Sequence, residues 1–160
     1  MAKPQRTGID LGEQKVLADI SEYGWHCMNV VEDDGQPPWS FTIGLYETWA
    51  HPELIITGRS RATAHEMLSC LVAEIEDGRP PDLTDPSAYT LVGIPCRFLE
   101  VHARHYTDYV GFARWFYRGK HFPLYQIVWP STDGLYPFDK AAPRSFKDWQ
   151  PVLGREPKSQ

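Results

Sequence analysis

The stretch FTIGLYETWAHPELIITG, residues 41–58, decides how the rest of the chain is arranged. It contains two β-rich runs, residues 41–45 and 53–57, on either side of a loop rich in rings and ionisable groups. The first run alternates large apolar residues with small ones, which is the period of a strand with one buried face. The second run is apolar almost throughout, as expected for a strand covered on both faces. We therefore predict two strands of one sheet, with the second near its centre.

The flanking sequence extends this sheet on the N-terminal side. Residues 25–33 read as another strand, and the turn-forming segment DGQPP leads from it back into residues 39–45, so a hairpin is expected. A helix is predicted from about Asp10, because Val16, Leu17 and Ile20 share one helical face and Gly24 follows as a stop.

On the C-terminal side, Ser60 is placed to cap a helix whose apolar residues follow the spacing i, i+3, i+4, i+7, i+8, i+11, and Gly78 ends it. A strand is expected at residues 94–105, a short aromatic helix at 108–119, a last strand at 124–129, and an aromatic-anchored coil after that. The predicted class is α+β, with a mainly antiparallel sheet of about five strands and two or three helices packed on it. We expect a flexible arm at residues 1–8, one globular domain at 9–153 and a polar tail at 154–160.

The overall charge argues against some classes of partner. The formal net charge of the 160-residue chain is −5, which disfavours a nucleic-acid binder because such proteins need surplus Lys and Arg. Between residues 96 and 121, however, five Arg or Lys stand against two Asp or Glu. This local surplus suits an anionic small ligand or an acidic patch on a protein partner.

Compartment and membrane association follow from cysteine content and hydropathy. Three cysteines form an odd set without paired spacing, so we interpret them as reduced thiols in a cytoplasmic protein. The N-terminal residues lack the apolar core of a signal peptide, and no run approaches 18 apolar residues, so we expect no membrane association.

Several motifs together resemble a known family. FTIGL followed by HPELII, then the long helix, IPCRF and QIVWPSTDGLYPF, is similar to the bacterial family called domain of unknown function 4262. The resemblance runs from about Ile20 to Leu153 and implies a compact, single-domain bacterial protein. It carries over no catalytic residue and no cofactor.

The loop after the first β-run is the leading candidate site. Loops on a rigid scaffold often carry binding residues, and we predict that this one forms one wall of a small polar-aromatic pocket whose other wall is the basic segment. The ligand-binding candidates are Tyr46, Glu47, Trp49, His51, Glu53, Arg104, Arg114 and Arg118. Trp115 or Tyr117 would supply a stacking ring. The alternative for the basic segment, which we favour, is a solvated face whose Arg stems cover apolar surface.

Two other functions stay open. A metal-dependent hydrolase would use His51 and Glu53, with His102 as a further candidate ligand, because zinc needs three or four converging donors. The structural alternative, which we favour, is that His51 hydrogen-bonds a loop carbonyl while Pro52 fixes the start of the next strand. A protein-interaction or immunity-type module would use exposed aromatics around Trp149 and Tyr136. No motif specifies a cofactor, an oligomeric state or whether the protein is an enzyme.

Overall fold

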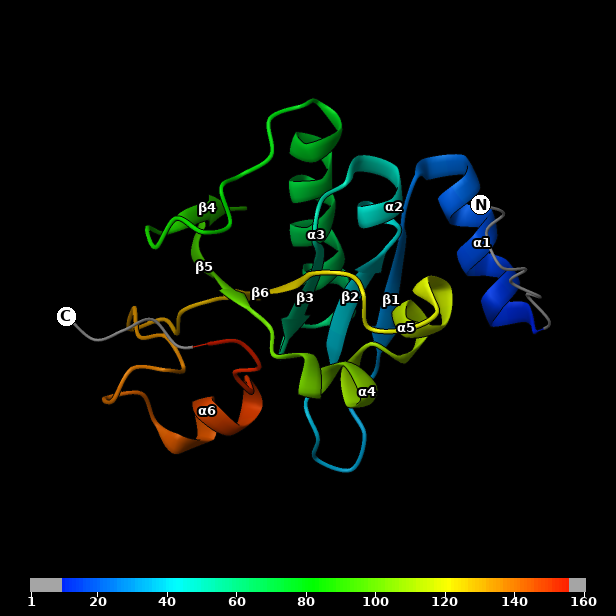
Figure 1. The fold of residues 1–160 in the computed structure, drawn as a ribbon. Helices are drawn as coiled ribbons and strands as arrows, with labels where there is room; N and C mark the ends of the chain where they lie inside the picture. Colours follow the sequence, from blue (N-terminus) through cyan, green and yellow to red (C-terminus); the bar gives the residue numbers. More distant parts are fainter. Residues whose placement is uncertain (1–9, 156–160) are drawn as a thin grey trace.

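The computed structural model describes residues 10–155, which form one six-stranded sheet flanked by helices. The predicted arm at residues 1–8, and the tail from residue 156 onward, lie outside the described residues. Figure 1 shows the sheet running from β1 at one edge to β4 at the other, in the order β1-β2-β3-β6-β5-β4. The strands are β1 (His26–Val30), β2 (Trp39–Ile43), β3 (Glu53–Thr57), β4 (Tyr89–Leu91), β5 (Ile94–Glu100) and β6 (Leu124–Val128).

Helices pack on both faces of this sheet. The helices are α1 (Leu11–Tyr23), α2 (Leu45–Trp49), α3 (Arg61–Glu76), α4 (Tyr106–Tyr109), α5 (Gly111–Tyr117) and α6 (Arg144–Trp149), with a 3-10 turn, η1, at Ala103–His105. The long helix α3 begins at its predicted cap, since Ser60 accepts from the Thr63 N–H. Its apolar face lies on one side of the sheet, together with the aromatic residues of α6. On the other side, α1, α4 and α5 enclose a second apolar cluster. Burial of β3 from both sides explains its nearly continuous apolar run.

The predicted α+β class is confirmed, while three details of the prediction are wrong: the number of strands, their relative direction and the number of helices. The sheet has six strands and is mixed rather than mainly antiparallel, because β3 and β6 pair in parallel through Glu53 and Leu124. The β1-β2 pairing follows the predicted hairpin signal, whereas the β5-β6 and β3-β6 pairings each join segments separated by helices, which local patterns do not encode. The predicted β3 position in the centre of the sheet is confirmed.

The described residues also contain more helices than the two or three expected. Residues 45–49 of the candidate loop form a turn of helix, and residues 144–149 of the predicted coil form another. The aromatic helix expected at 108–119 is divided at Val110, whose backbone dihedrals of −128° and 48° are not helical. The helices α2, α4, α5 and α6 are all short, and short helices give little periodic signal in a sequence.

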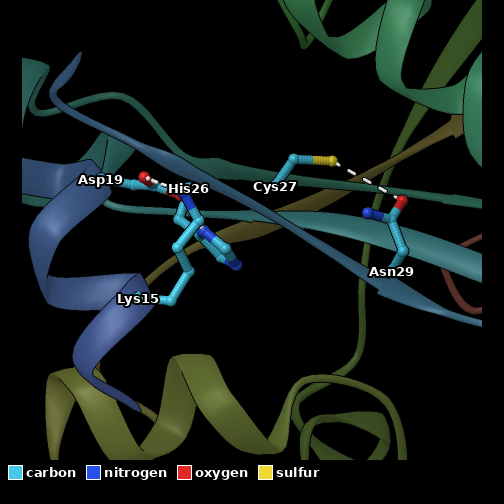
Figure 2. A network of polar contacts seen from close by, with 5 residues as sticks. All are labelled: Lys15, Asp19, His26, Cys27 and Asn29. Carbon is cyan, nitrogen blue, oxygen red and sulfur yellow. Dashed lines mark hydrogen bonds and ion pairs between the residues drawn. The ribbon is translucent and has the colours of Figure 1, made fainter. Parts of the chain in front are cut away.

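A polar network attaches α1 to the edge strand β1, as Figure 2 shows. The Asp19 carboxylate accepts from Lys15 Nζ at 2.9 Å and contacts His26 Nδ1 at 2.7 Å. Partial burial raises the pKa of Asp19, but the hydrogen bonds from Lys15 and His26 outweigh it, so the net pKa lies below its usual value. Further along β1, the Cys27 thiol is directed at Asn29 Oδ1, which also accepts from the Ser40 hydroxyl at 2.8 Å.

We predict that Asp19→Asn lowers the free energy of unfolding by about 1 kcal/mol at neutral pH. Because the folded-state pKa of Asp19 is lowered from 3.8, the stability it contributes is present above that value and is lost as the pH falls through the folded pKa. In urea denaturation, the wild type should therefore have a higher free energy of unfolding than Asp19→Asn above about pH 5. Well below about pH 3.8 the two proteins should have the same free energy of unfolding. A difference that persists unchanged at the acidic end would contradict the ion-pair interpretation.

Candidate functional site

The loop between β2 and β3 is organised around the buried carboxylate of Glu53, the first residue of β3. Glu53 is 0% exposed, although it was predicted to face a pocket. Its side chain turns back toward α2, where Oε2 accepts from the N–H groups of Gly44 at 3.0 Å and Tyr46 at 3.2 Å. Oε1 accepts from the Leu45 N–H at 3.2 Å and from the Thr42 hydroxyl at 2.7 Å. The carboxylate thus caps a helix that has no side-chain cap of its own.

Tyr117, at the end of α5, completes this network. Its hydroxyl donates to Glu53 Oε2 and accepts from the Glu47 N–H at 3.2 Å. Burial raises the pKa of the Glu53 carboxyl, while the surrounding donors oppose that effect. Burial and the adjacent carboxylate also raise the pKa of Tyr117, so its phenol keeps the proton it donates. Since every group that hydrogen-bonds to the Glu53 carboxylate oxygens is a donor, the arrangement fits the ionised carboxylate.

Glycine at position 44 is required by this geometry. Gly44 has a φ of 112°, in the region that favours glycine, and a Cβ there would lie 2.8 Å from the Gly24 carbonyl oxygen. The tight turn lets three successive N–H groups point at one carboxylate. The loop is therefore a well-packed connection around Glu53, and its polar interior is filled by protein groups.

His51 makes the hydrogen bond to a loop carbonyl that the structural alternative predicted. Its Nδ1 lies 2.7 Å from the Pro52 carbonyl oxygen, so Nδ1 carries the proton because a carbonyl can only accept. Nε2 is then a lone-pair acceptor, and it is buried without a hydrogen-bond partner. Burial lowers the pKa of His51, which keeps the ring neutral. In residues 10–155 no group of three or more His, Cys, Asp or Glu side chains is placed to hold a metal ion.

The structure brings the loop against the basic segment through Tyr117, but it does not gather all the predicted residues. Tyr46 is exposed and meets Tyr117 edge-on, with ring centroids 5.9 Å apart, whereas Trp49 packs against the α3 cluster. Glu47 is half-buried on α2.

The predicted basic residues divide between two elements. Arg104 is exposed in η1, where its Nε lies 3.4 Å from His105 Nε2, and the His102 ring lies 6.5 Å from that of His105. Arg114 is half-buried on α5, and Arg118 is exposed at the C-terminal end of that helix.

The aromatic residues suggested for protein interaction make intramolecular contacts. The Tyr136 ring stacks on Phe138 with centroids 5.4 Å apart, and Arg97 lies over Tyr136 at 5.5 Å. The half-buried Trp149 donates its indole N–H to the Gly58 carbonyl at 2.8 Å.

A hollow of about 470 Å³ lies elsewhere, between the end of β1 and the start of α3. We call it the arginine hollow, and its walls include Asn29, Pro38, Arg59, Ser60, Arg61 and Trp149. The Arg59 guanidinium lies 3.9 Å from the centroid of the Trp129 ring, and its Nε is buried without a hydrogen-bond partner. Burial lowers the pKa of Arg59. Among residues 10–155, neither Arg59 nor Arg61 forms an ion pair with a carboxylate.

A second and larger hollow, of about 730 Å³, lies on the opposite side of β1, against α4 and α5. We call it the aromatic hollow, because its walls include Trp39, Phe41, Tyr109, Phe112 and Trp115. None of the eight ligand-binding candidates lines either hollow, whereas Trp115, predicted as a possible stacking ring, lines the aromatic hollow and Trp149 lines the arginine hollow. The signal that could have located the arginine hollow was the pair of arginines on either side of the predicted cap Ser60.

Comparison with known proteins adds one assignment. A family model described as "Domain of unknown function (DUF4262)" matches residues 19–143. The chain belongs to the DUF4262 family. The DUF4262 match includes Glu53, Tyr117 and both arginines of the hollow, whereas Trp149 and the rest of α6 follow it. Neither the curated proteins nor the solved structures searched contain a match to the chain. None of the helices in residues 10–155 combines the length and apolar character needed to cross a membrane.

Proposed function

We propose that this DUF4262 protein binds a small anionic ligand, carrying a phosphate or carboxylate group, in the arginine hollow. The observation that carries the proposal is that Arg59 and Arg61 line one hollow and that, among residues 10–155, neither forms an ion pair, although Glu32 also lines that hollow. A partly buried guanidinium without a counter-ion is costly, and the planar donors of Arg suit phosphate and carboxylate oxygens. The volume of the hollow, about 470 Å³, suits a metabolite-sized molecule.

The remaining walls of the hollow would orient such a ligand. Trp149 offers a ring surface, and its indole N–H is already held by the Gly58 carbonyl, so the ring has a fixed position. Asn29, whose Oδ1 accepts from Ser40, adds an amide group beside the arginines. The Cys27 thiol stays protonated, because burial raises its pKa to about 11, so it adds no negative charge near Arg61.

The proposal assigns binding and no reaction. We place the protein in the bacterial cytoplasm, where its three free cysteines would remain reduced. The hollow differs in position from the predicted pocket of residues 46–53 and Arg104, Arg114 and Arg118, which remains an alternative location for the same kind of ligand.

The test is a thermal-shift titration with inorganic phosphate and with a nucleoside monophosphate. The wild-type protein should show a saturable rise in melting temperature of several degrees at ligand concentrations of about 100 Kd. Arg61→Ala should weaken binding by about tenfold, as loss of a charge-assisted contact does. Arg59→Gln should act in the same direction.

Arg104→Ala is the matched control, because Arg104 is an exposed member of the predicted basic segment and lies outside the hollow. We expect its titration to follow that of the wild type. If Arg104→Ala loses the response while Arg61→Ala keeps it, the ligand lies in the pocket predicted from the sequence. No saturable shift with either anion would reject the proposal.

A further inference from the structure

One side of the edge strand β1 presents unpaired backbone groups. Within residues 10–155, β2 is the only strand that pairs with β1, and the backbone of residues 28–31 bonds to no other element. Proteins usually protect a free edge with Pro, Lys, a bulge or a very short strand. The other edge strand, β4, has only three residues. β1 has five, HCMNV, with neither Pro nor Lys, and it pairs one-to-one with β2 without a bulge. Its free side is therefore suited to pairing with a further strand.

The two hollows lie on opposite faces of the sheet next to this free edge. Met28 and Val30 pack into the apolar cluster of α1, α4 and α5, and both line the aromatic hollow on that face. Cys27 packs against the α3 cluster on the other face, and the alternation of a strand places Asn29 on the same face as Cys27. Residues 29–31 line both hollows, so a segment paired with them would lie beside both.

A strand added to β1 would direct its side chains alternately toward the two hollows. Side chains of paired strands lie next to one another on the same face of a sheet. Partner residues opposite Met28 and Val30 would therefore point toward the aromatic hollow, whose rings include Trp39 and Trp115. The partner residue between them, opposite Asn29, would point toward the arginine hollow. Two chemically different hollows beside one strand thus define an alternating pattern in the partner.

The arginine hollow favours an acidic side chain in the partner. Arg59 and Arg61 line it, and neither forms an ion pair within residues 10–155. Burial raises the pKa of the Cys27 thiol to about 11, and the charge of Arg61 opposes that effect, which places Arg61 close to β1. Glu32 also lines the hollow, but the two guanidinium groups outnumber it. A guanidinium can bind a carboxylate through two parallel hydrogen bonds. The rings of the aromatic hollow instead suit an apolar side chain.

We infer that β1 binds an extended peptide of a protein partner as an added strand in which acidic side chains alternate with apolar ones. An acidic side chain occupies the arginine hollow, and the neighbouring apolar side chains contact the aromatic hollow. Backbone hydrogen bonds to β1 supply affinity, and the two hollows supply selectivity. The inference rests on the proposed anion binding by Arg59 and Arg61, and it names a peptide carboxylate as the anion.

The first experiment measures binding of end-blocked synthetic peptides to the full chain by isothermal titration calorimetry. The probe peptide has the sequence TLDVDLT, in which Asp alternates with Leu and Val. The comparison peptide, TLVDDLT, has the same composition without the alternation. We expect TLDVDLT to bind about tenfold more tightly than TLVDDLT. Equal affinities, or no binding of TLDVDLT, would overturn the inference.

Two further peptides test pairing through the backbone. Both repeat TLDVDLT, one with N-methyl groups on the Asp residues and the other with N-methyl groups on the Leu and Val residues. Because alternate N–H groups of a strand point to opposite edges, one of the two should bind about tenfold more weakly than the probe. If both bind as the probe does, the side chains act without strand addition and the inference fails. It also fails if the free chain sediments as a dimer that TLDVDLT does not dissociate, because a second copy then occupies the edge.

Variants separate this inference from the proposed anion binding. Arg61→Ala should weaken both TLDVDLT and inorganic phosphate about tenfold. Trp115→Leu should weaken TLDVDLT severalfold and leave phosphate affinity unchanged, because Trp115 lines the aromatic hollow and not the arginine hollow. Arg104→Ala is the matched control and should bind both as the wild type does, since Arg104 lines neither hollow. If phosphate binds and TLDVDLT does not, the peptide inference alone fails; if neither binds, the proposed function fails with it.

Discussion

Glu53→Gln is expected to lower the free energy of unfolding by about 3–5 kcal/mol, a large part of the stability of a typical domain. The Glu53 carboxylate accepts from five donors: the N–H groups of Gly44, Leu45 and Tyr46, and the hydroxyls of Thr42 and Tyr117. In Gln, one of the two oxygens becomes an NH₂ group, which would face N–H donors. At least two buried groups then lose their acceptor, and α2 loses part of its cap.

Urea denaturation at neutral pH measures this effect. Tyr117→Phe should cost less, about 1.5–3 kcal/mol, because it removes one donor to the carboxylate and the acceptor of the Glu47 N–H, while the three N–H groups that contact Glu53 keep their acceptor. Glu66→Gln, on the exposed side of α3, is the matched control and should change stability by less than about 0.5 kcal/mol. A Glu53→Gln protein as stable as the control would mean that the carboxylate does not hold α2, and the description of the loop as a packed connection would fail.

The sequence predicts much of this fold wherever a local pattern is long enough. The helix capped by Ser60 has six buried apolar residues on one face, so its period and its cap both appear in the sequence. The hairpin of β1 and β2 follows in the same way from alternation and a turn. The parallel pairing of β3 with β6 is a contact between segments about 70 residues apart, and nothing local to either strand specifies it.

The candidate site was predictable in part. The ionisable residues of loop 46–53 drew attention to Glu53, but a glutamate that starts a strand gives no sign that its carboxylate turns back to cap a helix. That arrangement depends on Gly44 and on Tyr117, which lies 64 residues further along the chain. The contact of His51 was easier to predict, because its neighbour Pro52 suggested a tightly held loop. The hydrogen bond between His51 Nδ1 and the Pro52 carbonyl agrees with that prediction. The two hollows arise from tertiary packing of β1 against segments distant in sequence, so residue patterns alone could not locate them.

Gln126, in the middle of β6, attaches the C-terminal segment to the sheet. Gln126 is 0% exposed, and its Oε1 accepts from the N–H groups of Leu153 at 2.7 Å and Gly154 at 3.3 Å. Its Nε2 donates to the Pro151 carbonyl at 2.7 Å. Gly154, which the sequence assigned to the polar tail, pairs with Val101 and lies too close to Leu99 for any larger residue. One buried amide therefore satisfies three backbone groups of a segment that has no sheet ladder of its own.

Gln126→Met should cost about 3–5 kcal/mol, because Met fills a similar volume but leaves those backbone groups without partners in a buried place. Urea denaturation gives the overall loss, and limited proteolysis should show earlier cleavage after residue 150 than in the wild type. The exposed Gln14→Met is the matched control and should be neutral in both assays. Because Trp149 precedes this segment and lines the arginine hollow, Gln126→Met should also weaken phosphate binding severalfold. A variant that resists protease as well as Gln14→Met does would show that the apolar contacts of Leu153 and α6 hold the segment without the amide, and Gln126 would then contribute only its own hydrogen bonds.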